Sequence, residues 1–239
     1  MYDLARGTLT QLTFNERDRR PVWSPDGKRV AYASVRGNGF KVFLINVDGS
    51  GEEQLTAGAG GGVPYSFSPD GRLLAYYGSG PNAGDPNGIW ILPLTGDRKP
   101  QFFRPGNEPD FSPDGRWIAY SVCDRDPCQL YVAPYPGPGE KQQVSANGEW
   151  DSRWSPDGRG LLWGGDGGVI GVSVTRAGSA LKLGKPRLLF KTQDGFAGVS
   201  PDGKRFLMVQ DLPTTPATQI NVVLNWTEDL ERASSSDRK

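Results

Sequence analysis

Serine and aspartate side chains recur at a fixed spacing in five copies of the sequence Ser-Pro-Asp-Gly. A serine near a carboxylate supplies two members of the Ser-His-Asp arrangement that activates a serine nucleophile. The chain of 239 residues contains no histidine, so this triad, imidazole acid–base catalysis and histidine metal ligation are all excluded. We therefore predict that the motif is structural and that the chain is not an enzyme. The motif residues are Ser24, Pro25, Asp26, Gly27, Ser68, Pro69, Asp70, Gly71, Ser112, Pro113, Asp114, Gly115, Ser155, Pro156, Asp157, Gly158, Ser200, Pro201, Asp202 and Gly203.

Turn chemistry explains why these four residue types occur together. Proline presets φ for the second position of a type I turn, aspartate can accept a backbone N–H two residues on, and glycine takes the positive φ that closes a bulged hairpin. A large side chain directly precedes each motif, namely Trp23, Phe67, Phe111, Trp154 and Val199. We predict five hairpin turns, with the preceding side chains packed between neighbouring sheets.

The motif is part of a longer repeat, because successive motif serines are separated by 44, 44, 43 and 45 residues. Each unit contains four short apolar runs separated by turn residues; in the first unit they end at Trp23 and span 28–34, 41–47 and 53–56. Four-stranded repeats of this length are typical of β-propeller blades. We predict an all-β propeller over residues 1–226, with five motif-bearing four-stranded antiparallel blades plus a partial blade. Residues 227–239 are expected to form a short helix and a disordered tail.

Composition narrows the range of partners. The 27 basic and 27 acidic residues cancel, whereas nucleic acids and anionic membranes attract a clustered basic excess. No apolar run approaches the roughly 18 residues of a membrane-spanning helix, and the first residues lack the pattern of an export signal. We expect no nucleic-acid binding, no membrane insertion by this chain and no cofactor.

The repeat resembles a known family. An aromatic residue, Ser-Pro-Asp-Gly-Lys/Arg, an apolar strand such as 116–122 and a closing Leu-Thr are similar to the repeat of TolB-like propellers. That family includes the amino-terminal propellers of prolyl oligopeptidase-type peptidases. The resemblance covers essentially residues 1–226 and implies a propeller without implying any single function.

A narrower resemblance involves five segments, 2–14, 129–139, 184–190, 200–210 and 220–233. They are similar to the carboxy-terminal, extracytoplasmic propeller of bacterial receptor-like serine/threonine kinases. This implies a non-catalytic sensor or protein-interaction module in the periplasm or otherwise outside the cytoplasm, binding a protein, a peptide or a small polar ligand. The alternative is the gating propeller of a prolyl oligopeptidase-type peptidase that lacks its hydrolase domain. No kinase motif occurs in the chain.

The number of blades remains open between two arrangements. Residues 1–5 and 8–13 resemble the third and fourth strands of a blade, and they precede the first motif. In the kinase propellers that this chain resembles, a further motif-bearing hairpin would precede these two segments. The chain is thus predicted to be either a fragment of a six-bladed ring or a five-bladed ring that residues 8–13 complete.

Two cysteines, Cys123 and Cys128, flank the turn between two predicted strands of the third unit. Cysteines that face each other across a hairpin can form a disulfide; the alternatives are two unrelated thiols or a metal pair, for which no third soft ligand is in sight. We expect the disulfide and no metal site. A disulfide is typical of an oxidising compartment, in agreement with the family resemblance.

The residues just before each motif vary and begin the strand nearest the propeller axis. The residue four before each serine and the residue two before it are predicted to share one face, because side chains alternate along a strand. They predict a group of charged residues at the channel mouth, which we call the collar. The charges of the collar either pair with one another and have a structural role, or they bind a peptide or small polar ligand. A glycosidase-type carboxylate pair is not expected, because Glu108 and Asp110 lie on one strand. The predicted collar residues are Arg19, Arg20, Asn107, Glu108, Asp110, Trp150, Asp151 and Arg153.

Overall fold

A computed structural model describes residues 1–37, 39–58, 60–124, 127–137, 139–145, 150–165, 167–177 and 180–210, with the backbone alone at 150 and 177. All of its strands lie in the first of two compact units, Met1–Val209. The predicted strand at 220–226 and the predicted helix and tail at 227–239 lie outside the described residues. Within the described part of the chain, no helix has the length and apolar character needed to cross a membrane.

Antiparallel sheets follow one another along the chain, and we number the motif-bearing ones as blades 1 to 5. Blade 1 consists of β3 (Arg19–Trp23), β4 (Arg29–Val35), β5 (Phe40–Asn46) and β6 (Glu53–Gln54). Blade 2 consists of β7 (Gly61–Phe67), β8 (Leu73–Ser79), β9 (Asn87–Pro93) and β10 (Gln101–Arg104). Blade 3 consists of β11 (Asn107–Phe111), β12 (Trp117–Val122), β13 (Gln129–Pro134) and β14 (Gln142–Ser145).

The last sheets and the first hairpin differ from this plan. Blade 4 consists of β15 (Trp150–Trp154), β16 (Gly160–Gly165), β17 (Gly168–Ala177), β18 (Ala180–Leu183) and β19 (Arg187–Lys191). The long β17 pairs with β19 through its first half and with β18 through its second half, so β18 is added to the predicted four strands. The described part of blade 5 is β20 (Gly195–Val199) and β21 (Phe206–Val209), and the hairpin of β1 (Tyr2–Asp3) and β2 (Thr8–Leu9) precedes blade 1.

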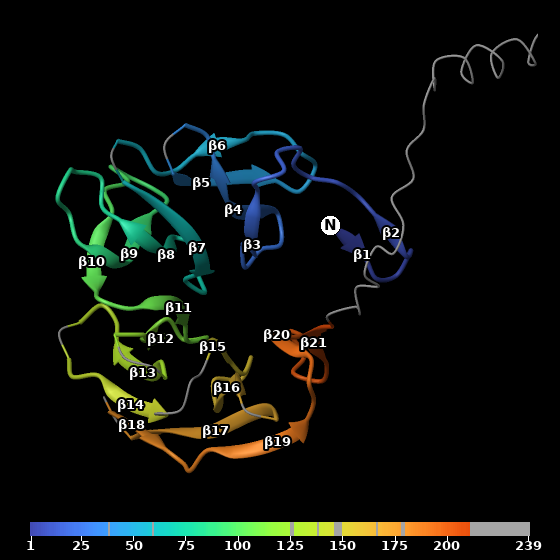
Figure 1. The fold of residues 1–239 in the computed structure, drawn as a ribbon, viewed down its shortest axis with the longest axis vertical. Coiled ribbons are helices and arrows are strands. Elements are labelled where there is room, and N and C mark those ends of the chain that lie inside the picture. The colour runs from blue at the N-terminus through green and yellow to red at the C-terminus, as the bar shows by residue number, and fades with distance from the viewer. Residues whose placement is uncertain are drawn as a thin grey trace, which may run out of the picture. The chain divides into compact units, whose positions relative to one another are not determined.

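Within this unit the blades are arranged around a centre, with β3, β7, β11, β15 and β20 as the innermost strands (Figure 1). Apolar clusters fill the spaces between successive blades: Leu44 of blade 1 packs with Leu74 of blade 2, and Val132 of blade 3 packs with Leu161 of blade 4. The middle strands of a blade are apolar on both faces because neighbouring blades pack against each face. This is the β-propeller that the repeat predicts.

Each motif forms a turn whose hydrogen bonds are almost all internal. In blade 1 the Ser24 hydroxyl donates to Asp26 Oδ1 at 2.6 Å and accepts the backbone N–H of Arg29 at 2.9 Å. The Asp26 carboxylate also accepts the N–H of Lys28, and Gly27 has a φ of 67°, where a side chain would be strained. The other four motifs repeat the serine–aspartate bond and the bond to the serine hydroxyl. The motif thus forms a turn in every blade.

The aspartate of the turn gives stability a pH dependence. Donation by the Ser68 hydroxyl, and then by the Arg72 N–H, lowers the pKa of Asp70. A carboxyl with a lowered folded-state pKa stabilises the fold above its unfolded pKa, and this contribution is lost as pH falls through the folded value. We expect Asp70→Asn to destabilise the protein at about pH 7 by less than about 1 kcal/mol, because the side chain is exposed, and to have a smaller effect at about pH 2.5. Urea unfolding at both pH values measures this; an equal loss at both contradicts the role of the charge.

The side chain before each motif is buried in three blades and exposed in one. Phe67, Phe111 and Trp154 have exposures of 7%, 6% and 6%, because the preceding blade covers each ring. Trp23 is 49% exposed, so the prediction of inter-sheet packing is wrong for blade 1. The sheet before blade 1 is, in the described residues, only the β1–β2 hairpin, and residues of the following segment cover part of the blade face through Leu12.

Candidate functional site

The innermost strands carry a β-bulge just before each motif, which positions the collar. In blade 3, Asn107 pairs with Ser121 and Asp110 pairs with Ala119, so three steps along β11 match two along β12. The bulge breaks the simple alternation that the sequence prediction assumed. The equivalent irregularity occurs in all five blades.

Three charged residues occupy a strained conformation at these bulges. Arg20, Glu108 and Asp151, each four residues before its motif serine, have φ values of 53°, 54° and 53°. This left-handed region costs a residue with a Cβ atom about 1–3 kcal/mol, and such residues concentrate at functional sites. The same strain therefore recurs at one position of blades 1, 3 and 4.

Arg20 contacts residues of three other blades. Its Nη1 lies 2.7 Å from Asp151 Oδ1 on β15, and its Nη2 lies 3.5 Å from Glu108 Oε1 on β11. Its guanidinium also lies over the ring of Tyr65 on β7, 4.9 Å from the ring centroid. The charged side chains therefore meet where the innermost strands face one another, and Arg20 joins blade 1 to blades 2, 3 and 4.

Glu108 is a buried carboxylate with a fixed role. It is 4% exposed, and its Oε2 accepts the Asp151 backbone N–H at 3.0 Å. Burial raises the pKa of this carboxyl, while the Asp151 N–H and the charge of Arg20 oppose part of the rise. Glu108 thus links the bulge of blade 3 to the bulge of blade 4.

Asp110, two residues after Glu108 on β11, links the same two blades. Its Oδ2 accepts the backbone N–H of Trp154 at 2.9 Å, and its backbone oxygen accepts the indole N–H of Trp154 at 3.1 Å. The Ser66 hydroxyl accepts the Phe111 N–H in the same way between blades 2 and 3, at 3.0 Å. Burial raises the pKa of the Asp110 carboxyl, and the charge of Arg153 opposes the rise. The position two before the motif is therefore an inter-blade hydrogen-bond acceptor in blades 2 and 3.

Arg153 has no close ion pair with a collar carboxylate. Its Nη1 donates to the Ser152 carbonyl at 2.9 Å, its Nη2 lies 3.8 Å from Asp151 Oδ1, and its side chain is 24% exposed. Neither interaction is a bidentate pair between the guanidinium and a carboxylate. A carboxylate or carbonyl of a partner could therefore bind Arg153 without breaking the Arg20–Asp151 pair.

Three predicted collar residues lie elsewhere or are not described. The Arg19 guanidinium stacks on Phe40, 3.7 Å from the ring centroid, and Asn107 Nδ2 lies 3.8 Å from Cys123 Sγ. Only the backbone of Trp150 is described, as the first residue of β15. The structure adds Tyr65, which sequence analysis missed because a bulge, unlike a regular strand, turns an extra residue toward the centre.

Cys123 and Cys128 form a disulfide, with an Sγ–Sγ distance of 2.11 Å. It joins the end of β12 to the start of β13, at the same end of blade 3 as Asn107. Among the residues that the structure describes, no group of three or more histidine, cysteine, aspartate or glutamate side chains is arranged to hold a metal ion.

Comparison with known proteins relates the chain to propellers. No family model matches it. It is 35% identical over 102 residues to the Tol-Pal system protein TolB of Gluconobacter oxydans, a match that covers 39% of this chain and 22% of that protein. The chain thus spans less than a quarter of that relative's length.

Solved structures share the fold at low sequence identity. A putative TolB from Agrobacterium tumefaciens superposes with a TM-score of 0.60 at 21% identity, over 80% of this chain and 69% of that one. A prolyl endopeptidase superposes with a TM-score of 0.51 at 19% identity, over 77% of this chain and 30% of that one. The chain therefore has the β-propeller fold, and its repeats are similar in sequence to those of TolB.

Proposed function

We propose that this chain is a non-catalytic propeller module that binds a protein or peptide through its collar, outside the cytoplasm. The observation that carries the proposal is the equivalent strain at Arg20, Glu108 and Asp151, which turns charged side chains to the centre of the blades. The fold does not need charge there, because blades 2 and 5 have Pro64 and Phe196 at the same position. Variation at an equivalent position of the repeat is what a recognition surface requires.

Two further observations support the partner class and the compartment. The sequence similarity to a protein of the Tol-Pal system, whose name denotes an assembly, favours a protein partner. The Cys123–Cys128 disulfide favours an oxidising compartment. The roles of Glu108 and Asp110 in bonding blade 4 weigh against catalysis, because both carboxylates already accept backbone N–H groups.

The finer proposal is a sensor propeller attached to a receptor-like kinase, and it rests on the sequence resemblance. The rival is a peptidase propeller; the likeness to a prolyl endopeptidase concerns the fold alone. Sequencing the gene in both directions separates the two. An in-frame kinase domain and membrane span support the sensor, whereas an in-frame hydrolase domain contradicts it.

Binding at the collar is tested with selected peptides. Phage displaying random peptides are panned on the full chain, and binding of the enriched peptides is measured by calorimetry. We expect Arg153→Ala to weaken binding at least about tenfold, or about 1.4 kcal/mol, because the guanidinium loses a charge-assisted bond. Arg187→Ala, which removes an exposed arginine from β19 of the same blade, is expected to leave binding unchanged.

One result of this experiment would contradict the proposal. Equal affinity of wild type and Arg153→Ala, with both proteins melting at the same temperature, contradicts recognition by the collar. Asp110→Ala is unsuitable as a binding test, since it removes the acceptor of the Trp154 N–H and acts on stability as well.

A further inference from the structure

The inner end of blade 1 is open on one face. A groove of about 460 Å³ lies there, with residues 9–13 along one wall and Pro21, Trp23 and Val30 of β3 and β4 along the other. Leu12 packs on the apolar cluster that includes Val30, which is 4% exposed, whereas Trp23 is 49% exposed. The groove therefore leaves the tryptophan next to the first motif uncovered.

Blade 3 shows how a preceding hairpin covers a tryptophan in this position. The Asp110 carboxylate accepts the backbone N–H of Trp154 at 2.9 Å, and the Asp110 carbonyl accepts its indole N–H at 3.1 Å. Trp23 has the register of Trp154, because it pairs with Val30 as Trp154 pairs with Leu161. In an antiparallel pair the N–H groups alternate in direction, so this shared register points both backbone N–H groups away from their own hairpins. Among the described residues, no side chain accepts the Trp23 backbone N–H, and its indole N–H has no hydrogen-bond partner.

The motif turns also pack on one another in chain order. A Cβ atom on Gly71, Gly115 or Gly158 would lie 3.7, 3.3 or 3.7 Å from the Cδ atom of the proline in the preceding motif. Apart from its chain neighbours, no described atom lies within 4 Å of the equivalent point on Gly27. The first motif therefore lacks the proline contact that the preceding turn supplies to the motifs of blades 2, 3 and 4.

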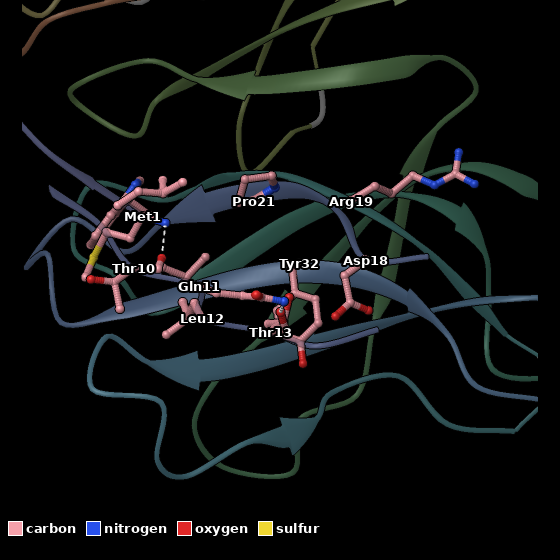
Figure 2. Close-up of a pocket in the computed structure, with 12 residues that line it drawn as sticks. Met1, Thr10, Gln11, Leu12, Thr13, Asp18, Arg19, Pro21 and Tyr32 are labelled. Atoms are coloured by element: carbon pink, nitrogen blue, oxygen red, sulfur yellow. Dashed lines mark hydrogen bonds between the residues drawn. The ribbon is translucent and has the colours of Figure 1, made fainter. Parts of the chain in front are cut away.

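A strand edge adjoins the same groove. β1 begins directly after Met1, which lines the groove beside Thr10 and donates its amino group to the Thr10 carbonyl (Figure 2). In the described part of the chain β1 pairs with β2 alone, so its other edge presents backbone donors and acceptors. Such an edge is where an added strand binds. An inserted hairpin would thus find both an uncovered tryptophan and a strand to pair with.

We propose that this groove binds a β-hairpin of a partner protein, and that the hairpin carries an Asp-aromatic-Ser-Pro-Asp-Gly sequence like that of residues 110–115. The internal repeat identifies the occupant. The carboxylate and the carbonyl of the first aspartate accept the two N–H groups of Trp23, and the motif proline packs on Gly27. These contacts repeat those of the blade 3 hairpin with blade 4. The second strand of the hairpin pairs with the outer edge of β1.

A second copy of this chain does not offer such a hairpin. Within one copy the acceptors of Asp110 and Ser66 are already bonded to blades 4 and 3. The equivalent residues of the other three motif-bearing blades are Val22, Arg153 and Gly198, whose side chains cannot accept a hydrogen bond. The occupant is therefore a hairpin of another protein.

The test uses the full-length, ¹⁵N-labelled protein and a cyclic peptide of residues 107–122, closed through a D-proline–glycine turn so that it is a hairpin before it binds. The Trp23 indole N–H resonance, assigned by its absence from Trp23→Phe, reports binding at the groove. We expect a saturable shift with a dissociation constant below about 1 mM. The peptide with Asp110→Ala should bind at least about tenfold more weakly, because it lacks the carboxylate acceptor.

Variants of the protein locate the bound peptide by calorimetry. Trp23→Ala should weaken binding of the unchanged peptide at least about tenfold, because it removes the ring and the indole donor. Phe102→Ala, which removes a 39% exposed ring from blade 2, should leave binding unchanged. Arg153→Ala should also leave it unchanged, because Arg153 does not line the groove. The result for Arg153 separates this site from the collar.

Three results would overturn the proposal. They are the absence of a saturable shift, equal binding of the Asp110→Ala peptide, and unchanged binding of the peptide to Trp23→Ala. A dimer in sedimentation velocity that Trp23→Ala dissociates would identify a second copy as the occupant and contradict a separate partner.

Discussion

Replacing Trp154 with alanine is expected to lower the free energy of unfolding by about 3–5 kcal/mol, the usual cost of removing a buried aromatic side chain. Trp154 is 6% exposed and packs between blades 3 and 4, with Trp117 and Trp163 in the same cluster. Its indole N–H also donates to the Asp110 carbonyl at 3.1 Å. The substitution therefore removes both apolar contact and an inter-blade hydrogen bond.

Trp23→Ala is the matched control, because Trp23 holds the same place before the motif of blade 1. It is 49% exposed, so its loss is expected to cost less than about 1 kcal/mol. Urea unfolding followed by circular dichroism measures both variants. Similar losses for the two tryptophans would mean that blade 1 is covered in solution by a further element, and the exposed face described above would be wrong.

Glu108→Ala is expected to destabilise the protein by about 2–3 kcal/mol. The alanine leaves the Asp151 N–H without its acceptor and takes one carboxylate from Arg20, in a site where Glu108 is 4% exposed. Glu108→Gln keeps an acceptor oxygen of the same shape and is expected to cost less than about 1 kcal/mol at about pH 7. Chemical unfolding of the two variants separates the loss of the acceptor from the loss of the charge.

The charge of Glu108 adds a pH dependence of definite sign. Burial raises the pKa of this carboxyl, so the unfolded chain ionises it at a lower pH than the folded protein does. Stability from this group therefore falls as pH rises from the unfolded value through the folded pKa. The stability of Glu108→Gln relative to wild type should improve between about pH 4 and about pH 7. A difference that stays constant or moves the other way contradicts the dominance of burial.

The turns and strands could be predicted from sequence because the interactions that form them are local. The Ser24 hydroxyl bonds residues two and five positions away, so the residue types alone specify the turn. The apolar runs then specify strands, and their repetition specifies blades. The exposure of Trp23 could not be predicted in this way, because burial depends on a neighbouring sheet rather than on the residue itself.

Part of the membership of the collar could be predicted from the sequence, but its geometry could not. Sequence spacing brought together Arg20, Glu108 and Asp151, yet the Arg20–Asp151 bond joins residues 131 positions apart and depends on the placement of whole blades. Alternation along a regular strand would place Tyr65 on the opposite side from its neighbours, and the bulge at β7 changes this.

The internal bonding of each Ser-Pro-Asp-Gly turn has a consequence for the order of folding. A hairpin whose bonds close within five residues forms quickly and needs no distant contact. Each inner hairpin can thus form early, whereas the apolar faces become buried only when adjacent blades meet. The bonds from Ser66 to Phe111 and from Asp110 to Trp154 then couple these early units. Cooperative unfolding of the propeller therefore depends on a few inter-blade acceptors, while the turns themselves can persist in a partly unfolded chain.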